Sequence, residues 1–374
     1  MDSSEQPKGG EIVVPKTPYA VIMAGGRGER FWPLSNARHP KQVLPLIDDR
    51  PMIIMAVDYL QGVVPPDHIF VITSQDLVPA IAAAVPQIPS EQIIGEPVGR
   101  DTAAVCALAS VLVRARDPDG VFCILTADHR ITDLDVFRST IRDAVTLAAA
   151  ENCLITIGIR PLTPSTGFGY IEAGVSLDRN SGTRFFRTRR FVEKPNRETA
   201  QAYLDAGNFY WNSGMFIWSA KTLQTAFRQH TPSLARLIDE LEAAVGTVTF
   251  TQVLATAYDK LKRISIDYAL MEKADNIVMA HGAFGWDDVG SWPALAHHRP
   301  HDTADNVVVG DAVLLDSQRN IVFSKARVTA LLGVQNLVVV QADDVTMVCH
   351  IDRAQDIKKL VQQVGAQEAL RRLL

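Results

Sequence analysis

The sequence predicts an α/β fold with a Rossmann-like, mostly parallel sheet, helices on both faces of that sheet, and a small C-terminal all-β unit. Two observations support this prediction. Short apolar runs rich in Val and Ile alternate with helix-like segments over residues 19–160, which is the pattern of successive strand–helix–strand units. After Pro300 short apolar runs instead follow one another, separated by turn residues.

In the first half of the chain, predicted strands and helices alternate. The runs YAVIMA, HIFVIT, VFCILTAD and CLITIGIR predict buried strands, because each is short and largely apolar. The segments between them are helix-like, and Asp101 is placed to cap the third of these helices. In chain order, the sequence predicts strands at 19–24, 68–73, 121–128 and 153–160, and helices at 51–63, 74–84, 102–114 and 135–150.

The second half is less regular. Residues 185–195 and 209–220 predict further strands with a helix at 196–207 between them, and residues 221–275 predict mainly helices. Five short strands over about 303–352 predict the all-β unit, for which a β-helix is one arrangement, and residues 351–374 predict a closing helix. The expected organisation is a polar leader at 1–17, a large domain at 18–300, and the β unit with its C-terminal helix at 301–374.

Composition limits the classes of function. Hydrophobic residues make up 47% and charged residues 21% of the 374, as in an ordinary globular protein, and the net charge of −5 gives no general attraction for nucleic acid. The four cysteines stand singly without metal-ligand spacing, which predicts reduced core thiols in a cytoplasmic protein. No signal segment is expected, and the longest apolar stretch, around 103–113, is too short to span a membrane.

The segment MAGGRGERFWPLSNARHPKQ, residues 23–42, concentrates positive charge behind the first predicted strand. Ligands of open parallel sheets bind beyond the carboxyl ends of the strands, and glycines let backbone N–H groups approach a bound oxyanion. The segment contains one acid, Glu29, and four cationic residues, Arg27, Arg30, Arg38 and Lys41. A nucleoside triphosphate carries about four negative charges, so this segment predicts a triphosphate site.

Two common phosphate-binding loops do not fit this segment. The pattern GxxxxGK[ST] is absent, and GxGxxG fails because Phe31 stands where its last glycine would be. The longer pattern GGxGxRxxPxSxxxxPK, which ends at Pro40-Lys41, is more specific than its glycines alone. The apolar Phe31 and Trp32 argue further against a merely solvated basic loop.

This longer pattern resembles the sugar-1-phosphate nucleotidyltransferases, and within them most closely the guanylyltransferases that act on mannose 1-phosphate. The other matching segments keep the family's order and cover nearly the whole chain: GEPVGRDTAAV, TADH, STGFGYIE, FVEKP, WNSGMF, WDDVGSW and NVVVGDAVLLDSQRNIVFS. The resemblance implies a nucleotidyltransferase domain at 18–300. It also implies an enzyme that transfers GMP from GTP to mannose 1-phosphate, giving GDP-mannose and pyrophosphate.

The resemblance implies a Mg²⁺ site made by Asp128 of TADH and Asp288 of WDDVGSW, with Asp288 favoured over its neighbour Asp287. Magnesium usually takes one or two carboxylates together with phosphate oxygens and water. A single Asp at a strand end is often a helix cap or turn residue, so the pair matters more than either acid. We expect His129 to be structural rather than a metal ligand.

The resemblance also implies which residues hold the nucleotide. Arg30 and Lys41 would bind the β and γ phosphates, and Arg100 would donate to a carbonyl of the base. Asp101 and Ala104 replace the Asn and Pro that the family more often has, and Asp101 has the alternative role of capping the helix that begins at Thr102. The expected nucleotide contacts are Ala24, Gly25, Gly26, Arg27, Gly28, Glu96, Gly99, Arg100, Asp101 and Thr102.

For the sugar, the resemblance implies that Glu193 and Asn212 bind hydroxyl groups, that Gly169 lets the backbone approach, and that Lys194 steadies the sugar phosphate. The alternatives are an exposed Glu193–Lys194 ion pair and a turn role for Asn212. Adjacent residues of a strand point to opposite faces, so Glu193 and Lys194 would meet only if a bulge or Pro195 turns the chain.

The implied reaction needs no general base, because the attacking sugar phosphate is already an anion at neutral pH. One alternative is a nucleotidyltransferase that uses another nucleoside triphosphate or another sugar 1-phosphate. Another is a non-catalytic regulatory subunit, which would be expected to lose a loop cation or a metal acid, whereas Arg30, Lys41, Asp128 and Asp288 are all present. We expect no nucleic-acid or membrane partner, and the β unit leaves a homodimer open.

Overall fold

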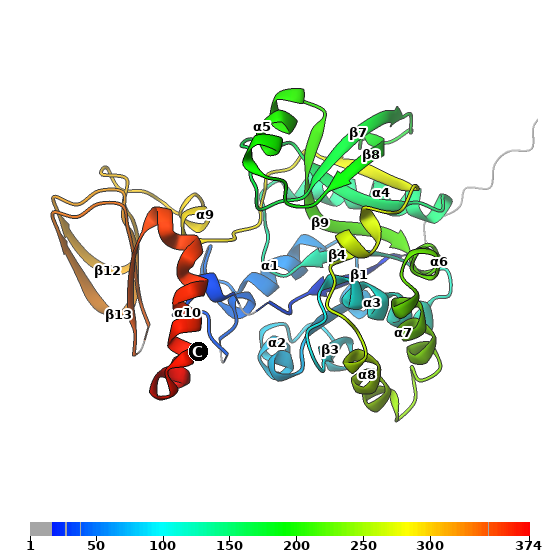
Figure 1. Cartoon of the computed structure of the whole chain (residues 1–374), viewed down its shortest axis with the longest axis horizontal. Coiled ribbons are helices and arrows are strands. Elements are labelled where there is room, and N and C mark those ends of the chain that lie inside the picture. The colour runs from blue at the N-terminus through cyan, green and yellow to red at the C-terminus, as the bar shows by residue number, and fades with distance from the viewer. Residues whose placement is uncertain (1–16, 27, 38, 343) are drawn as a thin grey trace, which may run out of the picture.

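A mixed nine-stranded sheet forms the centre of the computed structural model, which describes residues 17–26, 28–37, 39–342 and 344–374 (Figure 1). In spatial order, its strands are β3 (Ile93–Glu96), β2 (Ile69–Ser74), β1 (Tyr19–Met23), β4 (Val121–Thr126), β9 (Phe209–Ser219), β6 (Leu154–Ile159), β10 (Ile277–Gly282), β8 (Phe185–Val192) and β7 (Tyr170–Leu177). A separate two-stranded sheet pairs β5 (Arg130–Ile131) with β11 (Trp286–Asp287).

Parallel pairing is confined to two parts of this sheet. Strands β3, β2, β1 and β4 run parallel to one another, as do β6 and β10. Strand β9 runs antiparallel to both β4 and β6, and β7 and β8 also pair in antiparallel fashion. The prediction of a mostly parallel sheet is therefore too simple. Sequence reasoning missed β7 and β10, because a short apolar run carries too little periodicity to distinguish a strand from a helix segment.

Helices pack on both faces of the sheet, and β1 shows how the sequence divides between them. Ala20 and Ile22 join one hydrophobic core, whereas Tyr19 and Val21 join the other, since successive strand residues point to opposite faces. The first core includes residues of α1 (Met52–Tyr59), α2 (Val78–Ala84), α4 (Leu134–Ala150) and α5 (Arg197–Ala206). The second includes α3 (Thr102–Arg116), α6 (Ala220–His230), α7 (Pro232–Glu242) and α8 (Phe250–Asp259). No helix in the described part of the chain is both long and apolar enough to cross a membrane.

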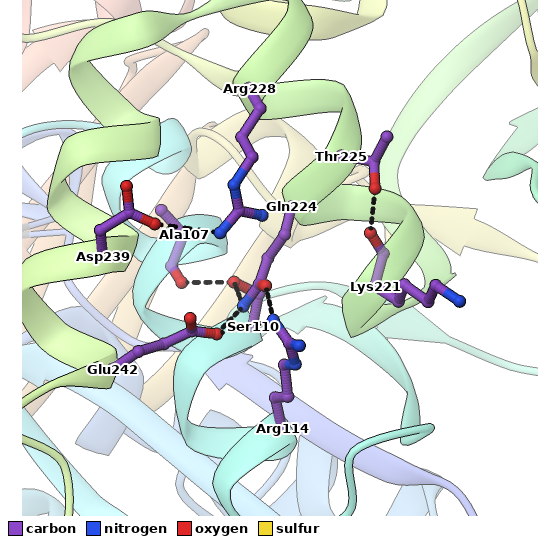
Figure 2. Close-up of polar contacts among 9 residues, drawn as sticks. All are labelled: Ala107, Ser110, Arg114, Lys221, Gln224, Thr225, Arg228, Asp239 and Glu242. Atoms are coloured by element: carbon purple, nitrogen blue, oxygen red, sulfur yellow. Dashed lines mark hydrogen bonds and ion pairs between the residues drawn. The ribbon is translucent and has the colours of Figure 1, made fainter.

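A polar network fixes the spacing of three helices on the second face (Figure 2). The side chain of Gln224 in α6 is fully buried. Its amide oxygen accepts a hydrogen bond from Arg114 Nη1 of α3 at 2.6 Å, and its amide nitrogen donates to Glu242 Oε1 of α7 at 2.9 Å. Arg114 also pairs with Glu242 at 3.0 Å. Because the buried amide is satisfied on both sides, this network holds α3, α6 and α7 in one arrangement.

The C-terminal β unit is a four-stranded sheet of β12 (Val307–Leu315), β13 (Ile321–Leu332), β14 (Leu337–Gln341) and β15 (Thr346–His350). The β12–β13 and β13–β14 pairs are parallel although their connections are short, as in the successive coils of a β-helix. Strand β15 then turns back antiparallel to β14. The predicted closing helix is divided into η7 (Ile351–Asp356), α10 (Ile357–Ala366) and η8 (Glu368–Leu373).

The β unit shares its core with the large domain. Phe323 and Val338 belong to the same hydrophobic cluster as Ile22 of β1. Trp292 of α9 (Trp292–Ala296) bridges the two parts, with its ring 4.8 Å from that of Phe323 and 5.1 Å from that of Phe31. Figure 1 shows α10, in red, between the β unit and the blue N-terminal segment. The β unit is thus packed against the large domain through a continuous apolar interior.

Candidate active site

The signature loop, residues 23–42, begins at the carboxyl end of β1. Ala24 continues the strand pairing, since its N–H donates to the carbonyl of Ile72 at 2.8 Å and its own carbonyl accepts from Thr73 Oγ1 at 2.9 Å. The loop therefore starts at the edge where parallel sheets bind ligands. Two of its predicted cations, Arg27 and Arg38, lie outside the described residues.

The glycines of the signature loop allow its second half to fold back on its first. Gly28 has a φ of +63°, and a Cβ there would lie 2.4 Å from Lys41 Cβ and 2.8 Å from Ser35 Oγ. Only glycine fits this position without displacing Lys41. Gln42 Nε2 closes the same fold by donating to the carbonyl of Gly26 at 2.7 Å.

Lys41 brings the two predicted metal ligands to one place. It begins the 3-10 helix η2 (Lys41–Val43), and only 4% of its surface is exposed. Its Nζ lies 2.8 Å from Asp128 Oδ2 and 3.5 Å from the backbone carbonyl of Asp288. The same ammonium group sits over the Phe31 ring, 5.1 Å from its centroid. One buried cation therefore joins the signature loop, the end of β4 and the segment after β11.

The neighbours Asp287 and Asp288 have different surroundings. Asp287 Oδ2 pairs with His298 Nε2 at 3.0 Å, so this acid serves the local structure. Asp288 lies beside Arg30 of the 3-10 helix η1 (Glu29–Phe31). A Cβ added to Gly290 would lie 2.7 Å from Asp288 Oδ2 and 3.2 Å from Arg30 Nη1, so glycine leaves the room in which these groups approach. Asp288 therefore lies beside a cation of the signature loop whereas Asp287 does not, and its choice as the metal ligand remains a prediction.

The two predicted metal ligands, Asp128 and Asp288, differ in their affinity for protons. Burial alone would raise the pKa of Asp128, but the charge and hydrogen bond of Lys41, together with His129, lower it. Burial raises the pKa of Asp288, and the charges of His129 and Lys41 offset this only in part. Asp128 is consequently an anion at neutral pH and is already bound to one cation.

The carboxylates of Asp128 and Asp288 suit a hard divalent cation whose other ligands are phosphate oxygens and water. The part of the chain that the structure describes has no group of three or more His, Cys, Asp or Glu side chains that could hold a metal ion. Two carboxylates plus phosphate oxygens and water are the set that Mg²⁺ commonly takes, and the Lys41 ammonium already marks a cation position at Asp128. His129 accepts a hydrogen bond at Nδ1 from Trp286 Nε1 at 3.2 Å, which fits its predicted structural role.

Glu96 at the end of β3 faces the signature loop. A Cβ on Gly25 would lie 3.6 Å from Glu96 Oε2, and only 7% of the Glu96 surface is exposed. Burial raises the pKa of Glu96 to about 7, and the charge of Asp101 adds to this, although the nearby Tyr258 hydroxyl partly opposes it. A carboxyl group that is often neutral at physiological pH therefore lies against the predicted nucleotide loop, where it can donate as well as accept hydrogen bonds.

The unfolding free energy is expected to fall by about 3 kcal/mol, relative to a Glu96→Gln variant, as the pH rises from 4.5 through 7. The fold raises the pKa of Glu96 from 4.5 to about 7, so its stabilising contribution is complete below pH 4.5 and is lost as the pH rises through 7. Urea unfolding of both proteins at the two ends of this range measures the difference. A difference that stays constant with pH would contradict a buried neutral carboxyl group.

The segment after Glu96 is attached to the end of α8. Arg100 Nε donates to the carbonyl of Tyr258 at 2.8 Å, and its Nη2 donates to the carbonyl of Asp259 at 3.1 Å. The guanidinium group that was expected to reach a base carbonyl thus contacts backbone carbonyls in this structure. Gly99 is exposed, and among the described residues other than its two chain neighbours no atom lies within 4 Å of the place a Cβ would take. The backbone beside Gly99 is therefore open to a ligand.

Asp101 and Thr102 build the start of α3. Asp101 Oδ1 accepts from the Thr102 N–H at 2.9 Å, so the alternative capping role of Asp101 is confirmed. Its other oxygen pairs with Arg263 Nε at 3.3 Å. Thr102 Oγ1 accepts from the Ile266 N–H at 2.8 Å. Both side chains have structural partners, so their expected nucleotide contacts remain predictions.

The three predicted sugar-binding residues lie together. A Cβ on Gly169 would lie 2.5 Å from Glu193 Oε2 and 3.4 Å from Asn212 Cβ, and the Asn212 N–H donates to the Gly169 carbonyl at 2.8 Å. Lys194 has a φ of +45°, so the chain turns and Lys194 Nζ donates to Glu193 Oε1. Adjacent residues of a strand point to opposite faces, so Glu193 and Lys194 can meet only because the chain turns here.

Sequence reasoning missed Asp267, which begins the π-helix η6 (Asp267–Met271). Asn212 Nδ2 donates to Asp267 Oδ1 at 3.0 Å, and Asn212 Oδ1 accepts from Thr156 Oγ1 at 2.9 Å. Burial, together with the charge of Glu193, raises the pKa of Asp267 to about 6. The available signal was one acid within the apolar segment ISIDYAL, which also fits an ordinary helix start.

Comparison with known proteins identifies the family. Residues 19–305 match the family model described as Nucleotidyl transferase. The chain belongs to the nucleotidyl transferase family. Residues 310–364 match a second model, described as MannoseP isomerase/GMP-like beta-helix domain, which covers most of the C-terminal β unit of this nucleotidyl transferase.

Named relatives cover most of this nucleotidyl transferase. It is 36% identical over 353 residues to a mannose-1-phosphate guanylyltransferase of Escherichia coli, and 38% identical over 348 residues to one of Klebsiella pneumoniae. The alignments span 93% and 91% of this chain and 73% of each relative. A solved structure from Thermus thermophilus, described as a mannose-1-phosphate geranyltransferase, has a TM-score of 0.83 at 34% identity over 94% of this chain and all of that one.

Proposed function

We propose that this nucleotidyl transferase is a mannose-1-phosphate guanylyltransferase, which transfers GMP from GTP to mannose 1-phosphate to give GDP-mannose and pyrophosphate. The observation that carries the proposal is Lys41, whose ammonium joins the signature loop to Asp128 and to the backbone of Asp288. This arrangement places loop cations and two acids at the edge of the sheet, as a triphosphate and its metal require. The names and extents of the relatives support the choice of substrates.

The residues of this site position two anions that repel each other. Arg30 and Lys41 hold the β and γ phosphates of GTP, and Lys194 steadies the phosphate of the sugar. Asp128 and Asp288 would hold Mg²⁺, which would supply positive charge to offset that of the phosphates. A sugar phosphate oxygen then attacks the α-phosphorus in line and pyrophosphate leaves. Because that oxygen is already an anion, no side chain of the protein needs to remove a proton.

The sugar lies against Glu193 and Asn212. Glu193 accepts hydrogen bonds from sugar hydroxyls with its Oε2, since its Oε1 is bound by Lys194. Asn212 is fixed on both sides, by Asp267 at its nitrogen and Thr156 at its oxygen, so it presents a rigid edge. The close approach of Gly169 to Glu193 keeps this wall flat enough for a sugar ring.

The guanine and ribose lie between the signature loop and the segment around Glu96. Ala24, Gly25, Gly26 and Gly28 supply backbone groups, and the exposed backbone at Gly99 supplies more. The set is completed by the contacts proposed for Arg100, Asp101 and Thr102, and for Arg27, which lies outside the described residues. Reduced thiols fit a cytoplasmic enzyme, since all four cysteines are free.

A pyrophosphate-release assay of the purified chain tests the proposed function. GTP, ATP, UTP, CTP and dTTP are each combined with mannose 1-phosphate, and then GTP is combined with glucose 1-phosphate, all with Mg²⁺. We expect the highest kcat/KM for GTP with mannose 1-phosphate. A preference for another pair would establish the nucleotidyl transfer and change its substrates, whereas no turnover with any pair would favour a non-catalytic regulatory subunit.

Gly169→Ala is expected to raise the KM for mannose 1-phosphate about tenfold or more while the KM for GTP stays within about twofold. The new Cβ would lie 2.5 Å from Glu193 Oε2 and must push this carboxylate aside. Gly167→Ala is the matched control, because its nearest neighbour would be 3.6 Å away at Ser165 Oγ, an ordinary contact. Equal changes in both KM values would contradict a sugar-specific role for this wall.

We also propose a homodimer formed through the β unit. Val313, Leu315 and Leu332 are exposed by 63%, 60% and 70%, and the register pairs Leu315 with Leu332 on adjacent strands. An apolar patch of this kind on a sheet is typical of a contact surface. Light scattering of the purified chain, compared with a Leu315→Lys/Leu332→Lys variant, measures the oligomeric state, and a wild-type monomer would contradict the dimer.

A further inference from the structure

Resting on the proposed function, we infer that the C-terminal β unit is a positioning element for the signature loop, and that Gln355 orients Arg30 for the triphosphate. Gln355 lies in η7, directly after the last strand of the β unit. It is far from Arg30 in the sequence, and none of the motifs that point to nucleotide binding includes it. The inference therefore assigns a role to a part of the chain that carries none of the predicted site residues.

The contact with Gln355 fixes one edge of the Arg30 guanidinium. Arg30 Nη1 donates to Gln355 Oε1 at 3.1 Å. No carboxylate pairs with Arg30 in the described part of the chain at salt-bridge distance, although the Asp288 carboxylate is near its Nη1. Arg30 keeps several other N–H groups that are not used by Gln355, and these remain for an anion.

The chemistry of the amide matters as much as its position. A carboxylate at position 355 would orient Arg30 but would also neutralise it, and would compete with phosphate for the same N–H groups. A neutral amide oxygen accepts one hydrogen bond and leaves the positive charge available. Gln355 therefore reduces the rotational freedom of Arg30 without weakening its attraction for the triphosphate.

Two hydrogen bonds to backbone carbonyls attach Trp32 and Ala37 of the loop to the same C-terminal segment. Trp32 Nε1 donates to the carbonyl of Leu373 at 2.9 Å, and the Ala37 N–H donates to the carbonyl of Leu374 at 3.1 Å. The two donors, Trp32 and Ala37, lie between Arg30 and Lys41 in the sequence. Three hydrogen bonds thus tie the signature loop to residues 355–374, and a shift of that segment would move both phosphate-binding cations.

A series of aromatic contacts connects Lys41 with the core of the β unit. The Lys41 ammonium lies over Phe31, Phe31 packs edge-on against Trp292, and Trp292 packs against Phe323 of β13. All three rings are almost fully buried. Since buried rings in contact leave little space for rearrangement, the core of the β unit supports the position of Lys41.

Kinetics of Gln355 variants in the full chain test the inference. Gln355→Met keeps the length of the side chain but removes the acceptor, and Gln355→Glu adds a negative charge beside Arg30. Gln363→Glu is the matched control, because Gln363 lies exposed on α10 and makes no hydrogen bond to the described residues of the loop. For each protein, kcat, the KM for GTP, the KM for mannose 1-phosphate and the thermal unfolding midpoint are measured.

We expect Gln355→Met to lower kcat about tenfold and Gln355→Glu to raise the KM for GTP about tenfold, with the KM for mannose 1-phosphate unchanged in both. Gln363→Glu should match the original chain, and the unfolding midpoints of all variants should agree. Wild-type values of kcat and KM for GTP in both Gln355 variants would overturn the inference, as would parallel changes in the two KM values. Failure of the proposed function would instead appear as absence of turnover in the unaltered chain.

Discussion

Lys41→Met is expected to lower kcat by about two to three orders of magnitude, because a buried cation that acts on transferring phosphoryl groups contributes on that scale. Methionine retains the aliphatic part of the side chain, so the packing of Lys41 against Gly28 and Phe31 is preserved. What is lost is the ammonium that binds Asp128 at 2.8 Å and would bind the triphosphate. Steady-state kinetics together with a thermal unfolding scan measure this effect.

Lys260→Met is the control for the lost charge. Lys260 is mostly exposed and pairs with Glu240 at 3.1 Å on the outer helices, where an ion pair contributes little. This variant should keep the original turnover. If Lys41→Met is folded and retains near-normal turnover, Lys41 does not act on the phosphates, and the proposed mechanism loses its central cation.

Asp288→Asn is expected to lower kcat about a hundredfold or more and to raise the Mg²⁺ concentration needed for half-maximal activity. The substitution keeps the shape of the side chain but removes the charge that faces Arg30 and Lys41. Titration of activity with Mg²⁺ and with Mn²⁺ measures both effects. Restoration at high metal concentration would further identify Asp288 as a ligand.

Asp287→Asn is the matched control, since it changes the adjacent residue in the same way. Asp287 pairs with His298 at 3.0 Å, so its loss should lower the unfolding midpoint and leave the metal requirement unchanged. The opposite outcome, in which Asp287→Asn alters the metal requirement and Asp288→Asn does not, would exchange the roles of the two acids.

The sequence predicted those parts of the fold and site that depend on local pattern. The run YAVIMA is long enough and apolar enough to specify a buried strand, and the motif after it specifies the loop that carries Lys41. The family resemblance, rather than local pattern, implied a common sugar site for Gly169, Glu193 and Asn212, and the structure brings the three together. Strand β10 escaped prediction because its short run IVMAHG fits several environments equally well.

Long-range partners could not be predicted in the same way. Asp267 acts on Asn212 only because β9 and η6 meet in space, and a lone acid at the start of a helix has many ordinary explanations. Gln355 meets Arg30 because the β unit packs onto the large domain through Trp292. Contacts of this kind depend on how whole helices and strands pack. They therefore produce no regular spacing of residues that could be recognised in the sequence.

The antiparallel strand β9 has a consequence for how this enzyme could acquire new substrates. On one side of it lie β1, β3 and β4, at or just after whose ends stand Ala24, Glu96 and Asp128. On the other side lie β7 and β8, which are flanked by Gly169 and Glu193. The residues proposed to bind the donor and those proposed to bind the acceptor thus lie on opposite sides of this one strand. Substitutions in β7 and β8, which lie beyond β9 from the donor side, would therefore be the ones expected to change the acceptor while β1, β3 and β4 stay as they are.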